Sequence, residues 1–252
     1  MMRFILFLIL LIGFILGLAA FAPLGLVLKL SGAEARGINW TSAQGTLSGG
    51  EITGLRAGPD KIGDARVRLK PAALLAGRLE YDFDWAGPAG TGSGRAAASA
   101  TGATELRDFA FDLAVSEFGA FPIWLRRSGG RAQLNGDIIR LRNGECEEAR
   151  GTTWSDALER NESLLGPGWT DFTGALSCDG GALLIPFAST NGNGTRLDAA
   201  ARIGSATTAT LEARISGYVS EQARYALPMA GFAPDGGAFV YRYPGSQADL
   251  AQ

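Results

Sequence analysis

Apolar and polar residues alternate one by one in several short segments of the chain. Residues 65–70 alternate Ala, Val and Leu with Arg, Arg and Lys, and residues 79–85 carry Leu, Tyr, Phe and Trp at every second position. Because successive side chains of a strand point to opposite faces, this period of two is typical of strands with one apolar face. Similar segments predict further strands at 38–41, 51–55, 109–115, 138–142, 197–203, 209–215 and 239–243.

The order of these segments predicts the fold class. Strands do not alternate with helices along the chain, as a parallel α/β sheet would require, so an antiparallel sheet with one apolar face fits better. That face must be buried by curling of the sheet, by a few helices or by an apolar partner. We therefore expect a mainly β domain, built as a strongly twisted or half-rolled antiparallel sheet with one or two short helices.

Two short helices are indicated by their end signals. Ser155 is a suitable N-cap for a helix that Gly166 ends, and Ser220 is a suitable N-cap for a second helix that Pro228 stops. The irregular segment 116–127 is unusually apolar and is expected to cover one end of the sheet.

The N-terminal part of the chain is an apolar run from Phe4 to Leu28 without a charged residue. At about 1.5 Å of rise per residue, a helix of this length crosses the roughly 30 Å of bilayer hydrocarbon. A cleaved signal peptide is the alternative, because residues 20–22 read Ala-Phe-Ala; Pro23 would then follow the cut, and the run exceeds the usual 7–15 or so apolar residues. We favour an uncleaved transmembrane anchor. The expected division is a cytoplasmic N-terminus at 1–3, a transmembrane anchor at 4–28 and a β-rich domain at 29–252 on the other side of the membrane.

Two glycines within this run have a spacing that suits helix packing. Gly13 and Gly17 form a G-x-x-x-G pattern, which places both on one helix face and lets another transmembrane helix approach closely. They are candidate helix-packing residues. Arg3 favours a cytoplasmic N-terminus, although Lys29 and Arg36 at the other end weaken that signal.

Cys146 and Cys178 are the two cysteines of the chain. They are too few for a structural zinc site, no histidine is available as a further ligand, and their spacing is not that of a redox motif. A structural disulfide in an oxidising compartment is the simplest interpretation, with two unpaired buried thiols as the alternative. Closing a loop of about 32 residues would stabilise the fold by roughly 3–4 kcal/mol. Such a bridge indicates that residues 29–252 lie outside the cytoplasm.

Composition and motifs give little support to catalysis. The absence of histidine excludes histidine bases, Ser-His-Asp triads and imidazole metal ligands, and a net charge of −2 argues against nucleic acid as a partner. The glycine-rich residues 90–94 are interpreted as a loose connection, because no helix follows to complete a phosphate loop. We expect no enzyme activity, no cofactor and no metal.

Two groups of carboxylates are possible sites. The cluster of Glu145, Glu147 and Glu148 could bind a cation, but a solvated strand edge is favoured. Asp82 and Asp84 share one face of a strand, and they match the charged outer side of an amphipathic strand better than an acid/base pair.

A series of short motifs runs over nearly the entire chain. They are Gly-Thr-Leu-Ser-Gly-Gly at 45–50, Lys70-Pro71 with Leu-Leu-Ala-Gly-Arg-Leu at 74–79, Gly129-Gly130, Cys146 with Ala-Arg-Gly-Thr-Thr-Trp at 149–154, Leu-Ser-Cys-Asp-Gly-Gly at 176–181, and Leu-Pro-Met-Ala-Gly-Phe-Ala-Pro-Asp-Gly-Gly at 227–237. The order of these motifs resembles type II secretion system protein N, the GspN family. The resemblance implies a periplasmic β-rich domain at 29–252 on a single inner-membrane helix, a role in the export of folded proteins across the outer membrane, other secretion subunits as partners, and no catalytic residues.

Two alternatives of other classes stay open. Repeated amphipathic strands behind one inner-membrane helix also resemble AsmA-like periplasmic proteins, in which the apolar face of a curled sheet would line a groove for the acyl chains of lipids. A structural membrane-anchored scaffold outside secretion is the third. The sequence names neither the direct partner nor the oligomeric state.

Overall fold

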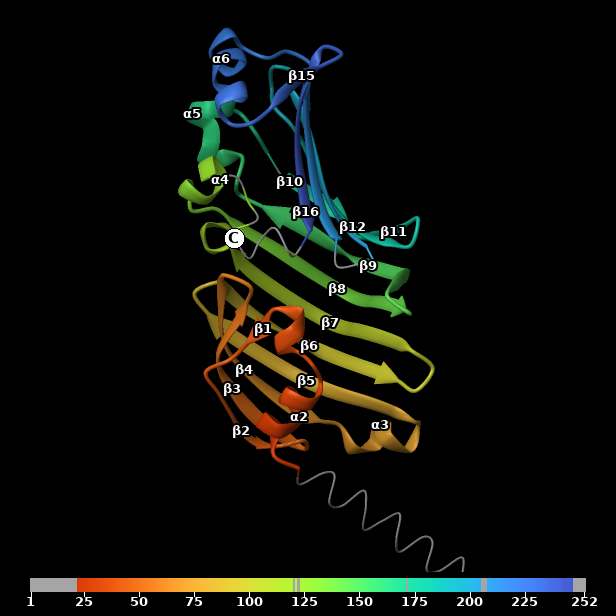
Figure 1. Cartoon of the computed structure of the whole chain (residues 1–252). Coiled ribbons are helices and arrows are strands. Elements are labelled where there is room, and N and C mark those ends of the chain that lie inside the picture. Colours follow the sequence, from red (N-terminus) through yellow and green to blue (C-terminus); the bar gives the residue numbers. More distant parts are fainter. Residues whose placement is uncertain (1–21, 120, 122, 171, 205–207, 247–252) are drawn as a thin grey trace, which may run out of the picture.

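The computed structural model describes residues 22–119, 121, 123–170, 172–204 and 208–246 (Figure 1). These residues form one open, 16-stranded antiparallel sheet. Its order is β1-β3-β4-β5-β6-β7-β8-β9-β10-β12-β13-β14-β16-β15, with β2 paired to β3 and β11 paired to β12. The strands are β1 (Ile38–Asn39), β2 (Ser42–Thr46), β3 (Gly49–Ala57), β4 (Asp60–Leu69), β5 (Arg78–Gly87), β6 (Gly90–Ser99), β7 (Ala103–Ala114), β8 (Arg131–Arg142), β9 (Glu145–Ser155), β10 (Phe172–Ala175), β11 (Ser177–Asp179), β12 (Ala182–Thr190), β13 (Arg196–Ile203), β14 (Thr208–Ser216), β15 (Ala233–Asp235) and β16 (Ala238–Ser246).

The sheet is bent along its length. In Figure 1, strands β12 to β16 stand steeply across the direction of β5 to β9, so the sheet turns where β10 and β11 lie between these two groups. Neighbours in sequence are neighbours in the sheet almost throughout, because short connections join antiparallel strands. The mainly β, antiparallel fold expected from the alternating segments is confirmed.

The helices of the described residues are short and lie at the ends of strands (Figure 1). There are more of them than the one or two expected, because several connections form a single helical turn. They are α2 (Leu24–Leu30), α3 (Pro71–Leu75), α4 (Ile123–Arg127), α5 (Glu162–Leu165), α6 (Glu221–Met229) and the 3₁₀ turns η1 (Glu34–Arg36), η2 (Val115–Glu117) and η3 (Glu159–Asn161).

The most strictly alternating segments form the strands that they predict. Val67 of β4 lies opposite Phe83 of β5, and Leu69 lies opposite Tyr81. The apolar positions of the two strands therefore share one face of the sheet, as a period of two requires.

The prediction of a loose connection at residues 90–94 is wrong. These residues begin β6, which pairs along its whole length with β5. Their glycines leave room for large rings: a Cβ atom on Gly94 would come 3.1 Å from Cζ of Phe83 and 3.1 Å from Cβ of Phe109. The strand is therefore glycine-rich because of its neighbours, although glycine usually weakens a strand.

One of the two predicted helices begins at the expected cap, and the other does not. Ser220 caps α6 by accepting a hydrogen bond from the backbone N–H of Ala223, as expected, and the helix continues one residue past Pro228. Ser155, by contrast, is the last residue of β9. Its hydroxyl donates to the carbonyl of Arg131 at 2.8 Å, and this bond holds the residue in the sheet, so that helix α5 starts only at Glu162.

The first residues that the structure describes pack against the sheet. Leu24 of α2 is buried, and it lies so close to Gly50 that a Cβ atom on this glycine would be 2.8 Å from Cδ2 of Leu24. The last residues of the predicted anchor, from Leu24 onward, thus belong to a helix packed on the domain. No helix in the described residues is long and apolar enough to span a membrane. Residues 4–21, including Gly13 and Gly17, lie outside the described residues.

Two apolar clusters form the core. One gathers under α5 and α6 and contains Leu158, Leu165, Trp169, Leu197, Ile215, Val219, Ala223, Leu227 and Phe232. The other lies at the bend of the sheet and contains Phe109, Ile139, Cys146, Leu176 and Leu183.

Candidate functional site on the inner face of the sheet

One face of the sheet is apolar from the first strands to the last. The register places Val67, Phe83 and Gly94 side by side, and it continues through Phe111 and Leu134. Phe83 and Phe111 stack with ring centroids 6.1 Å apart across the glycines of β6. Apolar side chains from separate strands thus form a continuous surface, which we call the inner face.

The bend of the sheet folds the inner face around a cavity of about 200 Å³. Leu134 of β8 and Leu211 of β14 both line it, although four strands, β9, β10, β12 and β13, separate β8 and β14 in the sheet. The apolar face is therefore the concave one. The lining residues are Leu113, Val115, Phe121, Leu125, Ala132, Gln133, Leu134, Ser155, Ala157, Leu158, Phe172, Ile185, Phe187, Leu197, Ala199, Ala201, Leu211, Ala213, Phe232 and Tyr241.

The cavity wall offers almost no polar group to a ligand. The hydroxyl of Ser155, which is one of the few polar groups among the lining residues, is already used in its bond to Arg131. Tyr241 packs on Phe232 with ring centroids 5.6 Å apart, and burial, with a smaller contribution from nearby Tyr243, raises the pKa of its phenol. Apolar cavities of about this size stay free of water and accept apolar ligands. This site therefore suits binding and not acid/base chemistry.

The segment between β7 and β8 closes one side of the cavity. Val115 of η2 is buried, and Phe121 and Leu125 join it in the cavity wall. The segment 116–127, expected at one end of the sheet, thus contributes Phe121 and Leu125 to the cavity on its inner face. Small side chains on the opposite wall, Ala199 and Ala213, leave the space open.

The opposite, outer face of the sheet carries ion pairs between neighbouring strands. Asp82 of β5 pairs with Lys70 at 3.0 Å, as expected for an outer position. Glu147 and Glu148 of the acidic cluster bind Arg142 and Arg140, respectively. Within the part of the chain that the structure describes, no group of acidic or cysteine side chains is arranged to hold a metal ion.

Glu105 of β7 is the centre of a network of ion pairs on this face. Its carboxylate accepts hydrogen bonds from Arg107 at 2.7 Å and Arg140 at 2.8 Å, and Arg140 also bonds Glu148 at 2.7 Å. Burial of the carboxyl opposes its ionisation, but the hydrogen bonds from Arg140 and Arg107 outweigh that effect. The pKa of Glu105 therefore lies below its ordinary value.

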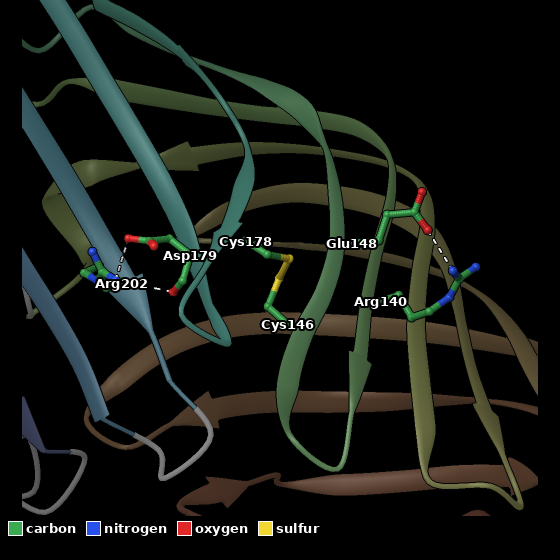
Figure 2. The surroundings of a disulfide bond; sticks show 6 residues. All are labelled: Arg140, Cys146, Glu148, Cys178, Asp179 and Arg202. Atoms are coloured by element: carbon green, nitrogen blue, oxygen red, sulfur yellow. Dashed lines mark hydrogen bonds and ion pairs between the residues drawn. A yellow bond between two sulfur atoms is a disulfide. The ribbon is translucent and has the colours of Figure 1, made fainter.

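The structure contains a disulfide between Cys146 of β9 and Cys178 of β11 (Figure 2). The two Cα atoms lie 5.4 Å apart; Cys146 belongs to the core cluster at the bend, and the partly buried Cys178 packs against it. Backbone bonds reinforce the junction, since the N–H of Cys146 donates to the carbonyl of Gly181 at 2.7 Å. The bridge thus fixes the strands where the sheet turns, next to the cavity but not in its wall.

The amphipathic strands are evident in the sequence, but the cavity is not. The glutamates, Asp82 and the cysteines lie away from the cavity wall, while its small residues, such as Ala199, Ala201 and Ala213, gave no motif. The available signal is the run of three alanines at 199–201 within a strand, because small residues on an apolar face leave space.

The fold and the site define a class of protein with an open antiparallel β-sheet, one face of which is apolar and curved around a cavity. The family model for type II secretion system (T2SS), protein N, matches residues 36–241, and the chain belongs to this family. It is therefore a component of a secretion system, whose function implies contacts with other subunits. No curated protein and no solved structure matches the chain.

Proposed function

We propose that the protein is an inner-membrane-anchored, periplasmic component of type II secretion that acts by binding an apolar segment of another envelope protein to its inner face. The observation that carries the proposal is the difference between the two faces. The outer face is covered with paired charges, whereas the inner face is apolar and curved around a cavity. Concave apolar sites with few polar groups are typical of binding sites.

The compartment and the anchor are supported by separate features. A disulfide is a stable structural element in an oxidising compartment such as the periplasm. The uncharged apolar residues from Phe4 to Phe21 directly precede α2 and supply the anchor. Since Leu24 packs on the sheet, the anchor would end near Pro23 and not at Leu28.

Secretion in a strain without this gene tests the proposal. Substrates are expected to accumulate in the periplasm and to be exported again when the wild-type gene is restored. Ala199→Phe fills the cavity and should leave export close to the deletion level. Ala200→Phe is the matched control. Ala200 is the next residue in β13, but it lies opposite Glu212, so its side chain is on the outer face. Equal export by both variants would contradict a role of the inner face.

The apolar cavity also favours a second candidate function, the holding of lipid acyl chains. A wall with almost no polar group fits a hydrocarbon chain as well as an apolar peptide segment. Mass spectrometry of purified protein separates the two candidates. Phospholipid retained by wild type and Ala200→Phe but lost from Ala199→Phe supports lipid binding, and absence of phospholipid from all three supports a protein partner.

A further inference from the structure

Exposed leucines gather at the end of the domain where the described chain begins. Leu75 of α3 is 94% exposed and Leu30 of α2 is 79% exposed. Leu26 and Leu74, in the same two helices, are also exposed. Figure 1 shows α2 and α3 at the same end of the molecule, beside the first strands of the sheet. Burial of such side chains is favourable, so a cluster of them indicates a surface that is covered in the cell.

Backbone hydrogen bonds tie the two helices to one turn. The N–H of Leu47, in the β2–β3 turn, donates to the carbonyl of Ala22 at 2.9 Å, just before α2. The adjacent Ser48 accepts from the N–H of Leu69 at 3.0 Å, two residues before α3 begins at Pro71. These bonds therefore fix the positions of the starts of α2 and α3 relative to each other, and the leucines of the two helices move together as one surface.

The chain itself indicates what covers this surface. The apolar run from Phe4 ends directly before α2, so the proposed anchor would leave the bilayer at this end of the domain. Exposed Lys29 of α2 adds a positive charge beside the leucines. Cationic and apolar side chains together are typical of segments that lie in the interface of an anionic membrane.

We propose that α2 and α3 rest on the membrane surface, with Leu26, Leu30, Leu74 and Leu75 among the lipid headgroups. This inference rests on the proposed anchor and adds a second membrane contact to it. Contact at two helices fixes the orientation of the sheet, so that the inner face is held at a defined height above the bilayer and is not free to swing on a flexible tether.

Spin labels in the full chain test this contact. The chain is reconstituted in vesicles of phosphatidylcholine and phosphatidylglycerol, with the disulfide intact. One variant carries a label at Leu75→Cys. The matched control carries it at Met229→Cys of α6, which is 84% exposed and lies at the opposite end of the domain in Figure 1. Neither side chain packs in a core cluster, so both variants are expected to fold.

The label at position 75 is expected to be more accessible to oxygen than to a water-soluble nickel complex, and the label at position 229 is expected to show the reverse. Equal aqueous accessibility at both positions, in protein that floats with the vesicles, overturns the inference and leaves the anchor intact. Protein that does not float with the vesicles contradicts the anchor, and the inference with it.

Discussion

Gly94 of β6 lies against the ring of Phe83 in the neighbouring strand, where a Cβ atom would come 3.1 Å from the end of that ring. Gly92 has the same relationship to Trp85, with Phe111 on its other side. The glycines let aromatic rings from β5 and β7 meet across β6, as the stacking of Phe83 on Phe111 shows. The apolar inner face is continuous because β6 has glycine at positions 92 and 94, where the rings of its neighbours lie.

Filling this gap should destabilise the domain. Gly92→Val places two methyl groups where Trp85 and Phe111 already lie, and overpacking of this kind costs about 1–3 kcal/mol. The free energy of unfolding in urea, followed by tryptophan fluorescence, measures the loss. Gly192→Ala is the control, because nothing lies within 4 Å of its added Cβ atom. A Gly92→Val protein as stable as this control would show that the rings do not need the space.

Removal of the disulfide should also destabilise the fold. Cys146 and Cys178 are 32 residues apart, and loop closure of this length contributes roughly 3–4 kcal/mol. The double variant Cys146→Ala, Cys178→Ala should lose this stability in denaturant unfolding. Reductant should lower the stability of the wild type toward that of the variant and leave the variant unchanged. Wild-type stability that does not respond to complete reduction would contradict a structural role.

Acid should weaken the outer-face network through Glu105. Its pKa is lowered in the folded state, so its contribution to stability is present above the ordinary value of 4.5 and is lost as the pH falls through the lower folded value. Glu105→Gln should be less stable than wild type at pH 7, and the difference should shrink as the pH falls below 4.5. Unfolding midpoints between neutral and acid pH measure this.

A control on the same face separates Glu105 from surface charge in general. Glu51→Gln removes a 3.7 Å pair with Arg66 whose side chains are largely exposed, and such pairs contribute little. Its stability should follow that of the wild type at each pH. If Glu105→Gln and wild type lose stability in parallel with falling pH, the network does not depend on this carboxylate.

The strands can be predicted from the sequence where apolar and polar residues alternate within the strand itself. Residues 65–70 and 79–85 carry their own pattern, and the structure pairs them with their apolar positions on one face. The strand at 90–99 carried no such signal, because its glycines and alanines are explained by rings in the strands on either side. The helix predicted at Ser155 fails for a related reason. Serine, which often caps helices, can equally bond to a neighbouring strand. The carbonyl that Ser155 bonds belongs to Arg131, which is 24 residues away in the sequence.

The cavity could not be predicted from local patterns. It exists because the sheet bends, and the bend brings Leu134 and Leu211 to one wall from strands far apart in the chain. The disulfide was easier to predict, since two cysteines allow one pairing. Its position at the bend depends on the register of β9, β11 and β12, which the sequence does not show.

Photo-crosslinking in living cells tests most directly whether the inner face binds another envelope component. Phe83 is half-buried on the inner face, and its sequence neighbour Asp84 is exposed on the outer face. The photoreactive residue p-azidophenylalanine is placed at one position or the other in the full chain. We predict an adduct with another secretion subunit or with lipid from position 83 and little or none from position 84. Equal adducts from both positions, or none from position 83, would contradict the account.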